Sequence, residues 1–243
     1  MIEMALRTTL RRLWILAALA LAVLAVQPIH SRLILILLLV AAGACWLGLA
    51  WLPRSRWVRL TSLLPLSLIG LVLLPGRAHD TRALRASYVA QLAAHEGSRY
   101  IWGGENLLGI DCSGLVRRGL IRASLARGVW TLNGRLVRLG LDLWWHDLSA
   151  RALGQGGGGR THQILTAARL DRLDHSPLRP GDLAVTADGV HVMAYLGRKT
   201  WIEADPDLAR VVRLVPSSRS FWLQVPVRIV RWNALAPPRA QRP

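Results

Sequence analysis

Hydrophobic residues are concentrated in the first third of the chain, in three long runs. Residues 13–29 and 33–52 are almost entirely apolar, and residues 57–75 form a third run that carries Arg59 near its start. A helix needs about 20 mostly apolar residues to cross a bilayer, with roughly 17 as the lower end. The pattern therefore predicts a membrane region over residues 1–76, with about three transmembrane helices at these runs.

Arginines flank the runs unevenly, and this asymmetry predicts a topology. The link between the first two runs, residues 27–32, holds one arginine, whereas the other flanks hold several. Cytoplasmic segments of membrane proteins carry the excess of positive charge. The N-terminus and the loop 53–59 are therefore expected in the cytoplasm. With three spans, everything after Gly76 lies outside the cytoplasm, whereas with two spans it lies inside. The flanking arginines are Arg7, Arg11 and Arg12 before the first run, and Arg54, Arg56 and Arg59 after the second.

Beyond the membrane region the chain changes to short amphipathic segments. Residues 79–95 and 113–127 have apolar positions at helical spacing, and both are predicted to be helices. Residues 129–170 are harder to interpret, because the apolar stretches near their start are compatible with short strands or with a packed loop. The glycine run at 154–159 predicts a flexible segment, and residues 161–173 are predicted to be helical.

Alternating apolar and polar positions dominate the last third of the chain. Such alternation is typical of half-buried strands, and Gly197-Arg-Lys has the composition of a hairpin turn. Helices followed by strands predict an α+β domain over residues 77–232, in which helices pack on an antiparallel sheet. The proline-rich tail, residues 233–243, is predicted to be disordered. The expected strands are 183–186, 190–196, 200–204, 210–215 and 221–232.

The charge composition is strongly basic and narrows the choice of partners. The formal net charge is +17, and Lys199 is the only lysine among 31 basic residues. Such a charge favours an anionic partner. The arginines are scattered, however, and no zinc-finger spacing, basic zipper or RNA-binding signature occurs, so no nucleic acid is expected. Membrane lipid and cell-wall polymer are the expected partners, and no cofactor or metal is expected.

Two cysteines are present, and their surroundings differ. Cys45 lies within an apolar run, so a disulfide with Cys112 is not expected. Cys112 follows the glycine-rich loop Tyr100-Ile-Trp-Gly-Gly and precedes a predicted helix. At a helix N-terminus the partial positive charge of the helix dipole favours a thiolate over a thiol. Cys112 is therefore a candidate nucleophile rather than a small buried hydrophobic residue.

A cysteine nucleophile needs a base within hydrogen-bonding reach and a group that orients the base. Among the seven histidines, His191 stands out because it begins a predicted strand directly after the turn Asp188-Gly. The next predicted strand offers Glu203. A carboxylate there would hold the imidazole tautomer, as the acid does in a Ser-His-Asp triad. Spacing alone does not distinguish Glu203 from a surface carboxylate.

These residues belong to four motifs in a fixed order: Tyr100-Ile-Trp-Gly-Gly, Asp111-Cys-Ser-Gly-Leu, Arg179-Pro-Gly-Asp-Leu and His191-Val-Met-Ala-Tyr-Leu-Gly. Together they resemble the NlpC/P60 family of papain-like cysteine peptidases, over roughly residues 84–232. The resemblance implies a papain-like α+β fold and hydrolysis of amide bonds in peptidoglycan stem peptides, of the γ-D-glutamyl-diaminopimelate type. With the apolar runs, it predicts a multi-pass protein of the bacterial inner membrane with an extracytoplasmic catalytic domain.

The resemblance also implies roles for single residues. Cys112 would be the nucleophile, His191 the base, and Glu203, twelve positions after the histidine, the third catalytic residue. The family more often has His, Asn or Gln at that position, so Glu203 is a departure, and Asp205 is the alternative. The residues that the resemblance implies in substrate binding are Tyr100, Asp111 and Ser113.

The interval between Cys112 and His191 is longer than is usual in the family, and the surplus is placed at about residues 129–170. Such an insertion would be a lid or specificity element if Trp144 and Trp145 contact the substrate. Alternatively, the two tryptophans fill a small core of the insertion itself.

Two other functions remain open. The same scaffold would also support an amidase or an acyltransferase, because a fold does not determine a reaction. A non-catalytic cell-wall-binding module on a membrane anchor is the second, and the unusual Glu203 keeps it open. The sequence carries no indication of the oligomeric state.

Overall fold

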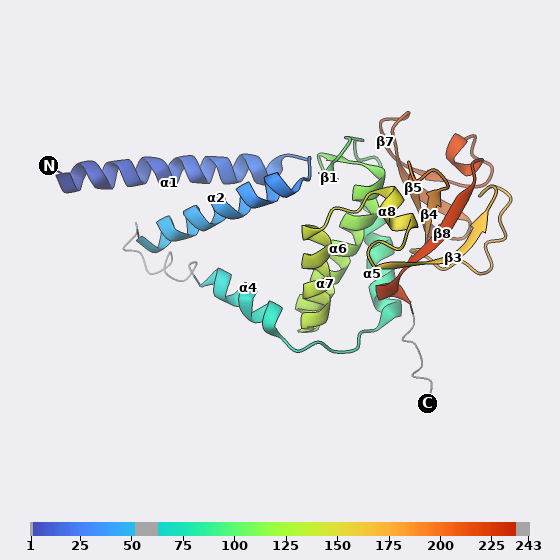
Figure 1. Cartoon of the computed structure of the whole chain (residues 1–243), viewed down its shortest axis with the longest axis horizontal. Helices are drawn as coiled ribbons and strands as arrows, with labels where there is room; N and C mark the ends of the chain where they lie inside the picture. Colours follow the sequence, from blue (N-terminus) through green and yellow to red (C-terminus); the bar gives the residue numbers. More distant parts are fainter. Residues whose placement is uncertain (1, 52–62, 237–243) are drawn as a thin grey trace.

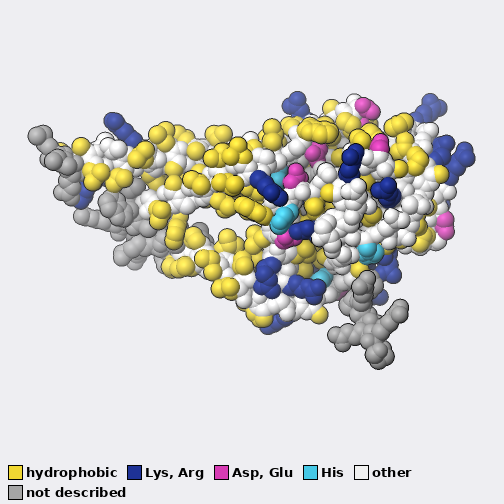
Figure 2. Space-filling view, viewed as in Figure 1, with side chains coloured by type: hydrophobic (Ala, Val, Ile, Leu, Met, Phe, Trp, Pro, Cys, Tyr) yellow, Lys and Arg dark blue, Asp and Glu magenta, His cyan; other side chains and the backbone are white. Residues whose placement is uncertain are grey.

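The structure, a computed structural model, describes residues 2–51 and 63–236. Helices α1 (Ile2–Val26) and α2 (Arg32–Trp51) form a long hairpin that projects from a globular α+β domain (Figure 1). Hydrophobic side chains cover this hairpin along its length (Figure 2). Met4–Val26 and Arg32–Leu49 are long and apolar enough to cross a membrane.

The two hairpin helices approach each other closely where α1 presents a tryptophan. The Nε1 of Trp14 donates to the carbonyl oxygen of Cys45 at 3.0 Å. A Cβ at Gly48 would lie 1.9 Å from the indole ring, so only glycine leaves room for Trp14 at this position. Cys45 is therefore part of the hairpin packing, and both Cys45 and Cys112 are free cysteines, as expected.

The third expected membrane helix, residues 57–75, is described only in part. Helix α4 (Leu64–Leu73) covers ten apolar residues, and residues 57–62 lie outside the described residues. Within the described part of the chain, two helices rather than three have the length and hydropathy of a span. α4 leads back toward the domain and contacts α7 (Gly134–Trp145) (Figure 1).

The domain consists of helices packed on an antiparallel sheet, which confirms the predicted α+β class. The large sheet has six strands in the order β3-β8-β4-β5-β6-β7, and a separate pair, β1-β2, precedes the cysteine helix. The helices are α5 (Thr81–Ala93), α6 (Cys112–Trp130), α7 and α8 (Ala150–Gly154). The strands are β1 (Glu105–Asn106), β2 (Gly109–Ile110), β3 (Thr161–Ala167), β4 (Leu183–Thr186), β5 (Val192–Gly197), β6 (Thr200–Asp205), β7 (Arg210–Leu214) and β8 (Val227–Trp232).

Two hydrophobic clusters hold the sheet on both faces. The larger cluster joins α5, α6 and α7 to the sheet through residues such as Leu84, Leu115 and Val230, all fully buried. The second cluster covers the opposite face of the sheet and includes Trp201 and Ile229. Burial of apolar surface is the main stabilising contribution here, and it fixes α6, with Cys112 at its N-terminus, against the sheet.

The helices expected at 79–95 and 113–127 are confirmed, but the interpretation of the next segment as strands or a loop is wrong. α6 continues to Trp130, and α7 follows after a turn in which Leu132 has a φ of +49°. Glycine is the usual residue in this left-handed conformation, so Leu132 gives no sequence signal of a helix end. In α7, Leu136, Gly140 and Leu143 are buried at helical spacing.

Most expected strands are confirmed, and the turn after Gly197 places Arg198 and Lys199 at φ of +50° and +59°. This is the left-handed conformation of a two-residue hairpin loop. The helix expected at 161–173 is wrong: Thr161–Ala167 is the edge strand β3, and it pairs with β8. A short segment with apolar residues on both faces does not show its period clearly.

The last expected strand ends at Trp232 as predicted, but its start differs from the prediction. Phe221–Leu223 form a 3-10 turn, η1, and the strand β8 starts only at Val227. Beyond the strand, Asn233–Leu235 form a second turn, η2, with Leu235 buried against the domain. The domain therefore extends past residue 232 into the expected disordered tail, of which residues 237–243 lie outside the described residues.

Candidate active site

Asp111 connects the glycine-rich loop to the N-terminus of α6. Its Oδ1 accepts hydrogen bonds from the backbone N–H of Gly114 (2.6 Å) and from the hydroxyl of Ser113 (3.0 Å). Its Oδ2 accepts from the N–H of Gly103 at 2.9 Å. Asp111 is thus the N-cap of the helix, a position where a carboxylate satisfies free backbone donors and favours the helix dipole.

Glycine is required at two points of this connection. Gly103 has a φ of +71°, which a residue with a Cβ rarely adopts. A Cβ at Gly114 would lie 2.2 Å from the carbonyl oxygen of Gly104. The loop can therefore run directly over the first turn of α6, and this explains why the Asp-Cys-Ser-Gly sequence ends in glycine.

Cys112 is the first residue of α6 and is buried. The N–H of Gly114 is taken by Asp111, whereas the backbone N–H groups of Cys112 and Ser113 have no acceptor within the helix. They are suited to hold a negative charge, whether on the sulfur or on an oxygen bonded next to it.

His191 lies just before β5, and its ring is fully enclosed. Its backbone N–H donates to the hydroxyl of Thr186 at 3.0 Å, and Thr186 in turn donates to the Asp188 carboxylate at 2.6 Å. Its ring Nε2 lies 2.7 Å from Oε2 of Glu203 on β6. Since Nε2 is engaged by the carboxylate, Nδ1 is the nitrogen left to face the thiol of Cys112, which lies within hydrogen-bonding reach of the ring.

The charges around His191 favour its protonated form. Burial lowers the pKa of His191, but the hydrogen bonds and charges of Cys112 and Glu203 outweigh burial and raise the pKa to about 9. Burial raises the pKa of Glu203, against the opposing hydrogen bond from the histidine. A histidine that keeps its proton near neutral pH is the partner that a cysteine nucleophile needs in order to ionise.

Of the two carboxylates proposed for the third position, Glu203 and not Asp205 contacts the histidine. The Oδ1 of Asp205 accepts from the backbone N–H groups of Asp207 (2.7 Å) and Leu208 (2.9 Å). It therefore closes the turn between β6 and β7. The structure brings Cys112, His191 and Glu203 together from α6, β5 and β6.

Tyr100 lies in the loop on the other side of the cysteine. Burial, together with the nearby Cys112 and Asp111, raises the pKa of Tyr100 to about 12. The phenol is therefore neutral and can donate a hydrogen bond at the mouth of the site.

One residue of the site was missed in the sequence. Trp222 stacks on the His191 ring, with centroids 4.1 Å apart and an interplanar angle of 23°. It lies in η1, which the pattern of Phe221 and its neighbours presented as part of a strand. No local signal in the sequence pointed from Trp222 to His191.

Trp144 and Trp145 lie at the C-terminal end of α7. Trp144 is half-buried and packs against the main core, whereas Trp145 is more exposed. In the described residues, no group of three or more histidine, cysteine or acidic side chains is arranged to hold a metal ion.

The comparisons with known proteins show the family of the chain. The chain matches the model of the NlpC/P60 family over residues 97–231, and it belongs to that family. A comparison with curated proteins gives no match.

Several solved structures are similar to parts of the chain. NlpC1 from Trichomonas vaginalis is 18% identical with a TM-score of 0.40, and the match covers 64% of this chain and 46% of that one. An NlpC/P60 family protein from Bacillus cereus is 15% identical with a TM-score of 0.39, over 65% and 41%. The peptidoglycan hydrolase RipB from Mycobacterium tuberculosis is 17% identical with a TM-score of 0.38, over 74% and 88%. The chain spans less than half the length of the first two proteins.

Proposed function

We propose that the protein is a membrane-anchored cysteine hydrolase that cleaves amide bonds in peptidoglycan stem peptides, of the γ-D-glutamyl-diaminopimelate type. The observation that carries the proposal is the contact of His191 with both Cys112 and Glu203. Membership of the NlpC/P60 family supports peptidoglycan as the substrate. The proposed catalytic domain covers residues 77–232, with an insertion at about 129–170, and the turn Asn233–Leu235 packs against it.

The site supports a two-step reaction. The Cys112 thiolate attacks the amide carbonyl carbon, and the negative charge that moves to the carbonyl oxygen is held by backbone N–H groups at the start of α6. His191 gives its proton to the leaving amine, the C–N bond breaks, and a thioester remains. Neutral His191 then takes a proton from water, the hydroxide attacks the thioester, and the carboxylic acid and free thiol are released.

Glu203 acts on the histidine and not on the substrate. It fixes the tautomer with Nδ1 toward sulfur and stabilises the imidazolium that forms in the first step. Glu203 is buried, and its Oε2 lies 2.7 Å from the ring Nε2. The residues proposed for substrate binding are Tyr100, Asp111 and Ser113.

The test is turnover of purified muropeptides by the full-length chain. Cys112→Ala should abolish cleavage without unfolding the domain, and mass spectrometry of the products identifies the bond. Retained cleavage would end the assignment of Cys112. Products that lack sugar, or that carry a transferred acyl group, would indicate an amidase or an acyltransferase instead. Binding without any Cys112-dependent product would indicate a wall-binding module.

We also propose that the protein lies in the inner membrane of a bacterium, with its catalytic domain outside the cytoplasm. The loop between α1 and α2 contacts the domain: the backbone N–H of His30 donates to the carbonyl of Gly103, and that of Glu105 donates to Pro28. Loop and domain must then be on the same side of the membrane. Because Arg7, Arg11 and Arg12 place the start of α1 in the cytoplasm, that side is the outer one, and residues 52–75 must return across the membrane.

A further inference from the structure

The loop between the two membrane helices lies against the loop that leads to the nucleophile. Ile29 and Gly104 form an antiparallel bridge, with backbone hydrogen bonds on both sides of it. The N–H of His30 donates to the carbonyl of Gly103 (2.8 Å), and the N–H of Glu105 donates to the carbonyl of Pro28 (2.9 Å). The helical hairpin thus adds a strand-like segment to the edge of the glycine-rich loop.

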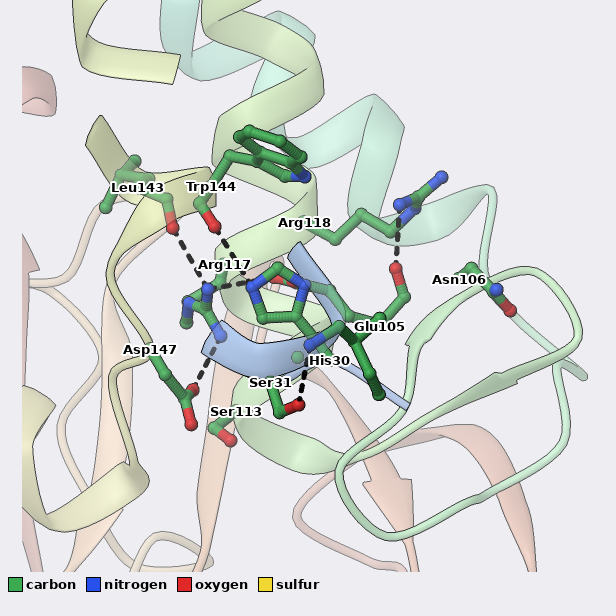
Figure 3. Close-up of polar contacts among 12 residues, drawn as sticks. His30, Ser31, Glu105, Asn106, Ser113, Arg117, Arg118, Leu143, Trp144 and Asp147 are labelled. Carbon is green, nitrogen blue, oxygen red and sulfur yellow. Dashed lines mark hydrogen bonds and ion pairs between the residues drawn. The ribbon is translucent and has the colours of Figure 1, made fainter. Parts of the chain in front are cut away.

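The side chain of His30 strengthens this contact on a second side. Its Nδ1 lies 3.0 Å from Oε2 of Glu105, and its Nε2 lies 3.0 Å from the carbonyl oxygen of Trp144 (Figure 3). Carboxylate and carbonyl oxygens are both hydrogen-bond acceptors, and each lies within reach of one ring nitrogen of His30. His30 therefore joins the hairpin to β1 and to α7.

Glu105 connects this histidine to the cysteine helix. Its Oε1 lies 3.5 Å from Nη2 of Arg117, and Arg117 also bonds to the carboxylate of Asp147 (2.7 Å) and to the carbonyl of Leu143 (3.0 Å) (Figure 3). Arg117 belongs to α6 and is buried. A continuous series of polar contacts therefore runs from the hairpin to the helix that begins with Cys112.

Gly103 and Gly104 provide the direct link between the hairpin and the site. The carbonyl of Gly103 accepts from His30, and its N–H donates to the carboxylate of Asp111 at 2.9 Å. The carbonyl of Gly104 accepts from the N–H of Asp111 at 3.0 Å. The hairpin loop, through His30, and Asp111, the N-cap of α6, therefore both bind the short segment Gly103-Gly104.

We propose that His30 is a positioning residue for Cys112, so that the membrane hairpin is a working part of the active site and not only an anchor. It acts through Glu105, Gly103 and Asp111, and it makes no contact with the substrate. This inference rests on the proposed role of Cys112 as the nucleophile. Displacement of the hairpin loop would release the glycine-rich loop and loosen the cap of α6. The sulfur of Cys112 and the backbone N–H groups that bind the oxyanion would then no longer be correctly positioned relative to each other.

The test measures thiol reactivity and turnover in the full-length chain, solubilised in detergent, with Cys45→Ala as background so that Cys112 is the only thiol. Alkylation by iodoacetamide is followed near pH 6.5, where an ordinary thiol is almost fully protonated and only an activated thiolate reacts quickly. We expect His30→Ala to slow alkylation of Cys112 and to lower kcat by about tenfold, with little change in KM.

His79→Ala is the matched control. The Nε2 of His79 also contacts a backbone carbonyl, that of Ala234 at 2.9 Å, but it touches neither the hairpin nor the glycine-rich loop. Its loss should leave both rates unchanged. Glu105→Gln keeps the volume of the side chain and removes its charge, so it should reproduce the slow alkylation even if His30→Ala fails to fold.

The two variants also test whether the residues act as one unit. If they do, the double variant His30→Ala/Glu105→Gln should be little slower than either single variant. Alkylation of Cys112 at the unaltered rate in folded His30→Ala or Glu105→Gln would overturn the inference. If Cys112 of the unaltered chain is alkylated quickly but no muropeptide is cleaved, the proposed substrate is wrong. The effect of His30 on the thiol is then still decided by the alkylation rates alone.

Discussion

At the scale of single residues, the site depends on backbone contacts that hold each reactive side chain. Cys112 starts a helix capped by Asp111, and His191 is held by the Thr186 hydroxyl. Glu203 lies at the centre of β6, paired with Val212 of β7. Each of the three side chains comes from a different element, so their mutual geometry depends on how α6 packs on the sheet.

The charge of Glu203 should set the alkaline limit of activity. The pKa of His191 is raised from 6.5 to about 9, so the imidazolium that protonates the leaving amine is present below that pH and lost above it. Glu203→Gln removes one of the charges that raise this pKa. We expect the alkaline limb of the kcat/KM profile to move to lower pH and kcat to fall.

Glu96→Gln is the control for this prediction, because it makes the same change at an exposed carboxylate that pairs with Arg213 at 2.8 Å. Its profile should keep the alkaline limb of the unaltered enzyme. An unchanged limb in Glu203→Gln would show that the carboxylate does not tune His191.

The stacking of Trp222 on His191 should contribute to the rate of reaction. An aromatic stack contributes about 1 kcal/mol beyond the area it buries, and a loss of that size in the transition state lowers kcat about fivefold. We expect Trp222→Ala to have this effect and Trp222→Phe to restore most of the rate. Trp130→Ala, which removes an exposed tryptophan on α6, should leave kcat unchanged. An unaffected kcat in Trp222→Ala would contradict the role of the stack.

At the scale of elements, the pattern along the chain predicted the strands better than the segment 129–170. Strands such as Leu183–Thr186 are bounded by turn residues, so their ends can be predicted from the sequence. The end of α6 cannot be predicted in this way, because Leu132 takes a left-handed conformation at a position without glycine. The position of Trp222 over His191 depends on long-range packing, which no local pattern contains.

The contacts of α7 favour a structural role for its tryptophans. Trp144 packs against the main core, and its carbonyl accepts from His30. We expect Trp144→Ala/Trp145→Ala to cost about 2 kcal/mol of stability, which lowers the melting temperature by roughly 4–8 °C, with KM for muropeptides unchanged. Thermal denaturation and steady-state kinetics measure both quantities.

Trp145→Ala alone removes the more exposed of the two rings, and it should lower the melting temperature much less. A rise in KM in the double variant at constant melting temperature would instead support a specificity element, as the length of the segment first indicated.

At the scale of the whole molecule, the decisive feature is the short loop between α1 and α2. The apolar runs and their flanking arginines predict membrane helices, but nothing in the sequence predicts that residues 28–30 pair with residues 103–105. That contact is between residues far apart in sequence, and its partners carry no motif. If α1 crosses the membrane, as we propose, a domain that touches this loop lies on the side opposite the start of α1.

The topology makes a prediction that fusion proteins can test. In the proposed topology the chain crosses the membrane once more between α2 and the domain, and the described α4 covers Leu64–Leu73 of this interval. A periplasmic reporter such as alkaline phosphatase fused after Trp232 should therefore be active, and the same reporter fused within residues 53–59 should be inactive. A reporter that works only in the cytoplasm should give the opposite pattern. Cytoplasmic activity after Trp232 would mean that the domain meets no polymerised wall, and it would also require the hairpin loop to leave Gly103. In that case His30→Ala should not slow the alkylation of Cys112, so the outcome of the fusion experiment predicts the outcome of the alkylation experiment.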